Sequence, residues 1–150
     1  MITRALILAA GRGERIGDPE TPNCLARVGN STLIDRTLRV LARAGIRKIG
    51  IVLGWQGGRL RAALEAGRGE RAAAGLDDLE VFDNPEWDGP NGLSVRAARS
   101  FVTERTLLVM ADQIAAPSLV SRSRSAMRAC GSTKRSRSNG RTSSSGDSPA

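Results

Sequence analysis

Short apolar segments recur along the first 112 residues of the chain. The two clearest, at 4–10 and 48–54, are continuous runs of apolar residues, as in strands that a sheet buries on both faces. Two further strand-like segments occupy 79–84 and 106–112. These patterns predict four β-strands.

The segments between the strands carry apolar residues at helical spacing. In the stretch 31–44, Ile34, Leu38 and Leu41 fall on one side and charged residues on the other, which predicts an amphipathic helix capped by Ser31 or Thr32. Further helices are predicted at 59–67 and from 90 or 91 through 102. Strand–helix alternation predicts an α/β fold in three layers, with a mainly parallel sheet and a site at the carboxyl ends of its strands.

A loop rich in glycine and proline, residues 11–23, follows the first strand, and nothing in it reads as helix. Gly11 and Gly13 allow successive N–H groups to turn towards an anion. The third glycine of the loop is Gly17, so the spacing departs from the GxGxxG dinucleotide fingerprint, and no Lys-Ser or Lys-Thr follows to make a P-loop.

The hexapeptide AGRGER occurs twice, at 10–15 and at 66–71. The first copy leaves a buried strand, where exposed amides can face a ligand. The second copy leaves a predicted helix and enters an Ala/Gly-rich stretch. We therefore expect a phosphate site only at the first copy, and a helix end followed by a solvated loop at the second.

The strings LILAAGRGERIG and PNCLARVGNSTLIDRTLRVLARAGIRKIGIVLG, with NPEWDGPNGLSVRAAR and LLVMADQI, resemble the MobA-like and sugar-phosphate nucleotidyltransferases. The similarity covers residues 3 to about 120, the amino-terminal part of such a domain. Within the family it is nearest to cytidylyltransferases for inositol-phosphate or phosphocholine-type alcohols. It implies a Rossmann-like, GT-A-type fold that transfers a nucleoside monophosphate from a triphosphate, CTP favoured, to a sugar phosphate or phospho-alcohol and releases pyrophosphate.

The resemblance also implies roles for individual residues. Catalysis would involve Arg15 and Asn23, and Asp112 would hold Mg²⁺. The nucleotide would contact the first loop and the start of the last predicted helix, at Leu8, Ala9, Ala10, Gly11, Arg12, Gly13, Gly92 and Ser94.

Each of these roles has a plainer alternative. Arg15 would then be a solvated loop arginine, Asp112 would cap a turn, and Ser94 would cap a helix. The sequence also departs from the family pattern, because Asn23 stands where the family has a charged lysine and the carboxyl-terminal half is missing. We therefore expect a truncated domain whose turnover is reduced or absent.

The amino-acid composition excludes several classes of catalytic and metal site. The chain has no histidine, which excludes Ser-His-Asp and Cys-His catalysis and the HExxH zinc site. Cys24 and Cys130 have no further thiol or imidazole to join them, so both are expected to be reduced thiols. No apolar segment approaches the roughly 20 residues of a membrane span, and no signal-peptide pattern opens the chain, so we expect a cytoplasmic protein without membrane association.

The formal charge of +8 belongs mainly to the last thirty residues. Residues 1–120 hold 16 basic and 14 acidic side chains, whereas 121–150 hold 7 and 1. We expect 1–120 to form the nucleotidyltransferase-type domain and 121–150, rich in Arg and Ser, to be disordered. The tail is read either as an RNA-binding arginine-serine segment or as the product of a shifted reading frame, and the second reading is preferred.

Two other functions stay open beside the transferase. One is a nucleotide-binding module without catalysis, and the other is RNA binding through the tail, which the nearly neutral body does not favour. A sheet that stops after four strands leaves an edge exposed, so self-association is expected as well.

Overall fold

A computed structural model describes residues 2–13, 20–76, 78–102 and 105–113. Its centre is a sheet of four parallel strands in the order β5-β4-β1-β6. The strands are β1 (Arg4–Ala9), β4 (Lys48–Leu53), β5 (Asp78–Asp83) and β6 (Thr106–Met110). Each begins and ends within one or two residues of the position that the apolar pattern predicts, so the four predicted strands are confirmed.

β1 lies between β4 and β6, in register with both. Ile7 pairs with Ile51 on one side and with Val109 on the other. Since β1 is fully enclosed, its side chains alternate between two apolar clusters rather than between core and solvent. This burial on both faces accounts for the continuous apolar run that the sequence shows there.

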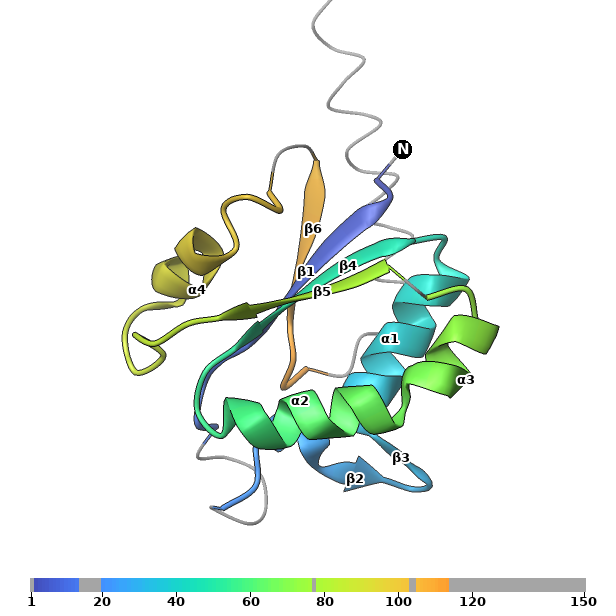
Figure 1. Ribbon diagram of the computed structural model, residues 1–150, viewed down its shortest axis with the longest axis horizontal. Coiled ribbons are helices and arrows are strands. Elements are labelled where there is room, and N and C mark those ends of the chain that lie inside the picture. The colour runs from blue at the N-terminus through green and yellow to red at the C-terminus, as the bar shows by residue number, and fades with distance from the viewer. Residues whose placement is uncertain (1, 14–19, 77, 103–104, 114–150) are drawn as a thin grey trace, which may run out of the picture.

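Helices cover both faces of the sheet, as Figure 1 shows. On one face lie α1 (Leu33–Arg43), α2 (Gly57–Ala66) and α3 (Arg68–Ala73), and on the other lies α4 (Asn91–Ala97). Ile34, Leu38 and Leu41 of α1 pack in the cluster on the first face, as their helical spacing predicts. The predicted three-layer α/β fold with a parallel sheet is confirmed.

A two-stranded hairpin, β2 (Arg27–Val28) and β3 (Ser31–Thr32), precedes α1 and follows a short 3-10 turn, η1 (Asn23–Leu25). The sequence reading did not predict it. The signal was present in the Gly29-Asn30 pair, since a two-residue loop with Gly at positive φ closes a tight hairpin. Gly29 has φ +65°.

The second AGRGER copy is helical, so the expectation of a solvated loop there was wrong. Residues 68–73 form α3, which buries no side chain. Its stability is local: Arg71 donates to the Leu64 carbonyl in α2, and Arg68 pairs with Glu65 at 3.6 Å. Because Ala, Arg and Glu are good helix formers, residues 68–73 are helical although one of them is glycine.

α4 is shorter than predicted, because it ends at Ala97 rather than near residue 102. Beyond it the chain makes tight turns, with Phe101 N–H donating to the Ala98 carbonyl at 3.0 Å. These turns bring the buried Phe101 ring against Gly50 of β4, where a β-carbon would lie 3.1 Å from the ring. Packing of Phe101 on the sheet thus ends the helix early.

Two further expectations concern membrane spans and the Arg/Ser tail. Within the described residues, no helix is both long and apolar enough to cross a membrane. The predicted Arg/Ser tail at 121–150 and Cys130 lie outside the described residues.

Candidate active site

A pocket opens where β1 and β6 end, at the carboxyl edge of the sheet. This is the edge at which open parallel sheets bind ligands. The pocket is lined by the end of β1 and its loop, by η1, by the segment that leads into α4, and by the end of β6: Leu8, Ala9, Ala10, Gly11, Gly13, Asn23, Cys24, Trp87, Asn91, Ser94, Met110, Ala111 and Asp112.

The loop after β1 is held by contacts with two other segments. The carbonyl of Ala10 accepts a hydrogen bond from the Trp55 N–H at 2.9 Å. Gly13 has φ +65°, and a β-carbon on it would lie 2.2 Å from Nδ2 of Asn23. Glycine is therefore needed at 13 both for its backbone angle and for the close approach of η1.

Asp112 comes to the same pocket from the end of β6. The N–H of Ala111 donates to the Leu8 carbonyl at 3.0 Å, which extends the β1–β6 pairing to the residue before Asp112. The Asp112 side chain is half-buried and lines the pocket. The strand pairing thus places one carboxylate beside the loop amides of 9–13.

Most of the residues that the resemblance singles out meet in this pocket. They come from four segments of the chain: Leu8, Ala9, Ala10, Gly11, Gly13, Asn23, Ser94 and Asp112. Arg12 and Gly92 do not line it. The Arg12 guanidinium lies 5.6 Å from the centre of the Trp55 ring, and Gly92 lies in the first turn of α4 with open space around its Cα. Arg15 lies outside the described residues.

Asn23 is 5% exposed, although it stands where the family has a charged lysine. Its Oδ1 is buried and has no hydrogen-bond partner among the residues that the structure describes. A neutral amide fits this closed position beside Gly13, whereas a buried charge would need a partner.

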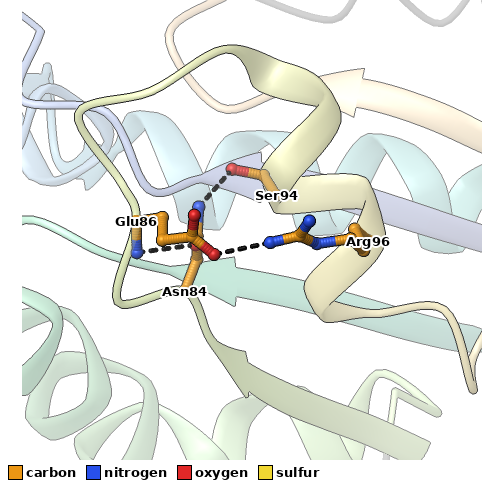
Figure 2. Close-up of polar contacts among 4 residues, drawn as sticks. All are labelled: Asn84, Glu86, Ser94 and Arg96. Carbon is orange, nitrogen blue, oxygen red and sulfur yellow. Dashed lines mark hydrogen bonds and ion pairs between the residues drawn. The ribbon is translucent and has the colours of Figure 1, made fainter.

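Ser94 does not cap α4, so the plainer alternative for this residue was wrong. The N-cap of α4 is Pro90, and no side chain bonds to the helix start. The Ser94 hydroxyl instead accepts a hydrogen bond from Nδ2 of Asn84 at 3.0 Å, and both residues are 5% exposed (Figure 2).

Sequence reading missed several residues of the pocket wall. Trp87, Asn91, Cys24, Met110 and Ala111 line it without having been predicted. The half-buried Trp87 had a signal, since a large aromatic residue stands in the otherwise polar segment NPEWDGPN. Cys24 had none: burial raises the pKa of its thiol to about 12, so the thiol is neutral at physiological pH.

Relatives of known sequence and structure share this fold. The chain is 40% identical over 119 residues to a bifunctional IPC transferase and DIPP synthase of Rubrobacter xylanophilus, which covers 79% of this chain and 26% of that protein. It is 33% identical over 123 residues to a CMP-5'-(3-aminopropyl)phosphonate synthase of Streptomyces rubellomurinus, covering 79% and 18%. The chain thus spans about a quarter or less of these relatives' length.

The structure is similar to that of an inositol-1-phosphate CTP transferase from T. maritima. The TM-score is 0.66 over 80% of this chain and 47% of the other, at 19% identity, so this likeness concerns the fold. The family model of the MobA-like NTP transferase domain matches residues 5–141. The family prediction is confirmed, and the chain belongs to the MobA-like NTP transferase domain family.

Proposed function

We propose that this chain is a nucleotidyltransferase domain that binds a nucleoside triphosphate with Mg²⁺ in the pocket at the end of β1. It transfers the nucleoside monophosphate to a phosphorylated alcohol or sugar and releases pyrophosphate. One observation supports this proposal above the others: the loop of Ala9–Gly13 and the Asp112 carboxylate line the same pocket. Backbone amides suit phosphate oxygens, and a carboxylate suits Mg²⁺.

The described residues fit a metal ion that arrives with its nucleotide. They contain no group of three His, Cys, Asp or Glu side chains able to hold a metal. Asp112 supplies a single carboxylate to the pocket. Mg²⁺ commonly takes one or two protein carboxylates and completes its shell with phosphate oxygens and water, so Asp112 with a triphosphate is a sufficient set.

The chemistry needs alignment and charge neutralisation more than acid–base groups, which suits a chain without histidine. An oxygen of the acceptor phosphate forms a bond to the α-phosphorus, and the bond from that phosphorus to the bridging oxygen breaks as pyrophosphate leaves. Bound Mg²⁺ would neutralise part of the phosphate charge. The amides of Gly11 and Gly13 would hold the phosphates. Arg15 would pair with the triphosphate, and Arg12, whose guanidinium lies against Trp55 outside the pocket lining, would have to turn to do so.

CTP is the favoured donor, and a phosphorylated small alcohol is the favoured acceptor. The relative from Streptomyces is named for a CMP-linked phosphonate, and it aligns with 79% of this chain. In this assignment Ser94 lies on the base side of the pocket, whereas Gly92, in the same helix, lies outside the lining. Because CTP is an intracellular metabolite and Cys24 is a buried thiol, we place the activity in the cytoplasm.

A nucleotide-binding module without catalysis is the second candidate, and Asn23 is the observation that favours it. An uncharged amide cannot neutralise phosphate charge as lysine does. Loss of one such group typically costs on the order of 10²–10³ in rate. Pyrophosphate release by the full chain, with CTP, UTP, GTP and ATP and a set of phosphorylated alcohols, separates the two candidates. Turnover excludes the module, and CTP binding without turnover at high protein concentration excludes the enzyme.

Replacing Asp112 tests the pocket itself. Asp112→Asn keeps the side-chain shape but removes the charge, so we expect the Mg²⁺-dependent part of CTP affinity to fall about tenfold, on the order of the loss of one charged contact. Tryptophan fluorescence is a suitable readout, because one of the two tryptophans, Trp87, lines the pocket. Asp88→Asn, at an exposed position outside the pocket, is the matched control.

The result that contradicts the proposal is a full chain whose fluorescence and pyrophosphate release do not respond to any nucleoside triphosphate with Mg²⁺. If CTP affinity fell equally in Asp112→Asn and Asp88→Asn, the Asp112 carboxylate would have no specific role in the pocket. The proposal that the chain binds a nucleotide would still stand.

A further inference from the structure

Asn84 lies outside the pocket lining but contacts two segments that form it. It follows β5 directly, and its N–H continues the sheet by donating to the Leu53 carbonyl at 2.8 Å. Its side chain is 5% exposed. It lies between Glu86, in the turn before α4, and Ser94 of α4 (Figure 2). A buried polar side chain in this place needs its hydrogen bonds satisfied, and two are.

The first hydrogen bond fixes the orientation of the Asn84 amide. The backbone N–H of Glu86 lies 3.0 Å from one polar atom of the side chain. A backbone N–H can only donate, so that atom must be the acceptor Oδ1. The other polar atom, which faces Ser94, is then the donor Nδ2. The orientation follows from the chemistry of the partners as well as from the coordinates.

The second hydrogen bond makes the Ser94 hydroxyl oxygen an acceptor. Nδ2 of Asn84 lies 3.0 Å from the Ser94 Oγ and can only donate, so Oγ accepts. The hydroxyl hydrogen of Ser94 must then point elsewhere. Among the residues that the structure describes, no group accepts it. Since Ser94 lines the pocket, this hydrogen is a donor available to a bound ligand.

We propose that Asn84 is a positioning residue for the nucleotide pocket: by donating to Ser94 it makes the Ser94 hydroxyl a hydrogen-bond donor to an acceptor atom of the bound nucleotide. The inference rests on the proposed function for the identity of the ligand. The same amide, through Glu86 N–H, holds the turn that contains Trp87, so one side chain contacts two segments of the pocket wall.

A substitution of nearly the same shape can replace the donor Nδ2 of Asn84, which contacts Ser94, by an acceptor oxygen. Asn84→Asp keeps an oxygen for Glu86 N–H and so keeps the turn, but it presents a second acceptor to Ser94. The Ser94 hydroxyl then donates to the new carboxylate and is lost to the ligand. We expect CTP affinity, measured with Mg²⁺ by tryptophan fluorescence, to fall about three- to tenfold, the usual value of one hydrogen bond.

Ser94→Ala is expected to lower CTP affinity by the same factor, and the double variant Asn84→Asp/Ser94→Ala by no more than either single one, because both remove one hydrogen bond. Glu86→Gln is the matched control. It weakens the exposed ion pair of Glu86 with Arg96, at 2.5 Å, but leaves the Glu86 N–H and the amide of Asn84 in place. CTP affinity of this variant should be unchanged.

The outcomes separate the inference from the proposed function. If the unaltered chain fails to bind CTP, the proposed function fails first. If the unaltered chain binds CTP and Asn84→Asp binds it equally well, the positioning role is overturned. A thermal midpoint lowered in Asn84→Asp with unchanged CTP affinity would assign Asn84 to stability alone. Losses that add in the double variant would also overturn the coupling, because the two residues would then act independently.

Discussion

Glycine is required at position 54 because two distant segments meet there. A β-carbon on Gly54 would lie 2.4 Å from the carbonyl oxygen of Ala10 and 2.4 Å from Cβ of Trp87. These neighbours belong to the loop after β1 and to the turn before α4, and both line the pocket. Gly58, four residues later in α2, has nothing within 4 Å of the same position. Close packing therefore requires glycine at position 54 but not at position 58.

Gly54→Ala is expected to lower the free energy of unfolding by about 1–3 kcal/mol, the usual cost of an added methyl group in a filled space. Gly58→Ala is the matched control and should be neutral or slightly stabilising, since alanine is the better helix former. Urea unfolding of both variants measures the difference. Equal stabilities of the two variants would show that the segments around Gly54 separate at little cost.

At the scale of a single element, the first turn of α1 has backbone N–H groups without a carbonyl acceptor inside the helix. A side chain accepts a hydrogen bond from one of them. The Thr32 Oγ1 accepts a hydrogen bond from the Asp35 N–H at 3.2 Å, and its own hydrogen donates to the Asp35 carboxylate at 2.6 Å. The acidic residue in the first turn also suits the positive end of the helix. The sequence offered Ser31 and Thr32 equally as caps, and the structure shows that Thr32 takes the role.

Thr32→Ala is expected to cost about 0.5–2 kcal/mol in the free energy of unfolding, because it leaves the Asp35 N–H without its acceptor. Thr32→Ser retains the hydroxyl and should recover most of that loss. Ser31→Ala, at the neighbouring residue with no role in the cap, should change stability by less than about 0.5 kcal/mol. Denaturant unfolding of the three variants distinguishes the two residues, and a larger loss at Ser31 would contradict the assignment.

At the scale of the whole molecule, the burial of Cys24 links stability to pH. Its side chain belongs to the apolar cluster beneath α1 and is 4% exposed, and burial raises the pKa of the thiol to about 12 from an ordinary 9.0. Above pH 9 the unfolded chain loses this proton while the folded chain keeps it. The contribution is complete below pH 9 and is lost as pH rises towards 12.

We expect the free energy of unfolding to fall as pH rises from 9 to 12, with Cys24 contributing a slope of up to about 1.4 kcal/mol per pH unit. The window is nearly free of other groups, because the chain has no tyrosine and two lysines. Cys24→Ala should flatten the slope even though the variant is less stable at neutral pH. An identical slope in both proteins would show that the folded thiol ionises as readily as the unfolded one.

The sequence by itself determined the four strands of the main sheet, the amphipathic helix α1 and the family. Strands buried on both faces produce continuous apolar runs, and a helix with one buried side produces a three-to-four-residue spacing, so β1, β4 and α1 follow from local pattern. The loop after β1 was equally visible, since two glycines follow the apolar run, and Gly13 does adopt a positive φ of +65°.

The tertiary structure decided what depends on contacts between distant segments. It left the described part of the first AGRGER copy, residues 10–13, outside any helix or strand at the end of β1, whereas residues 68–71 of the second copy belong to α3. It also brought Asp112 beside Ala9 and gave Ser94 its partner in Asn84. Hydrogen bonds and close packing act over a few ångströms in space, whereas sequence pattern reports only on neighbours along the chain.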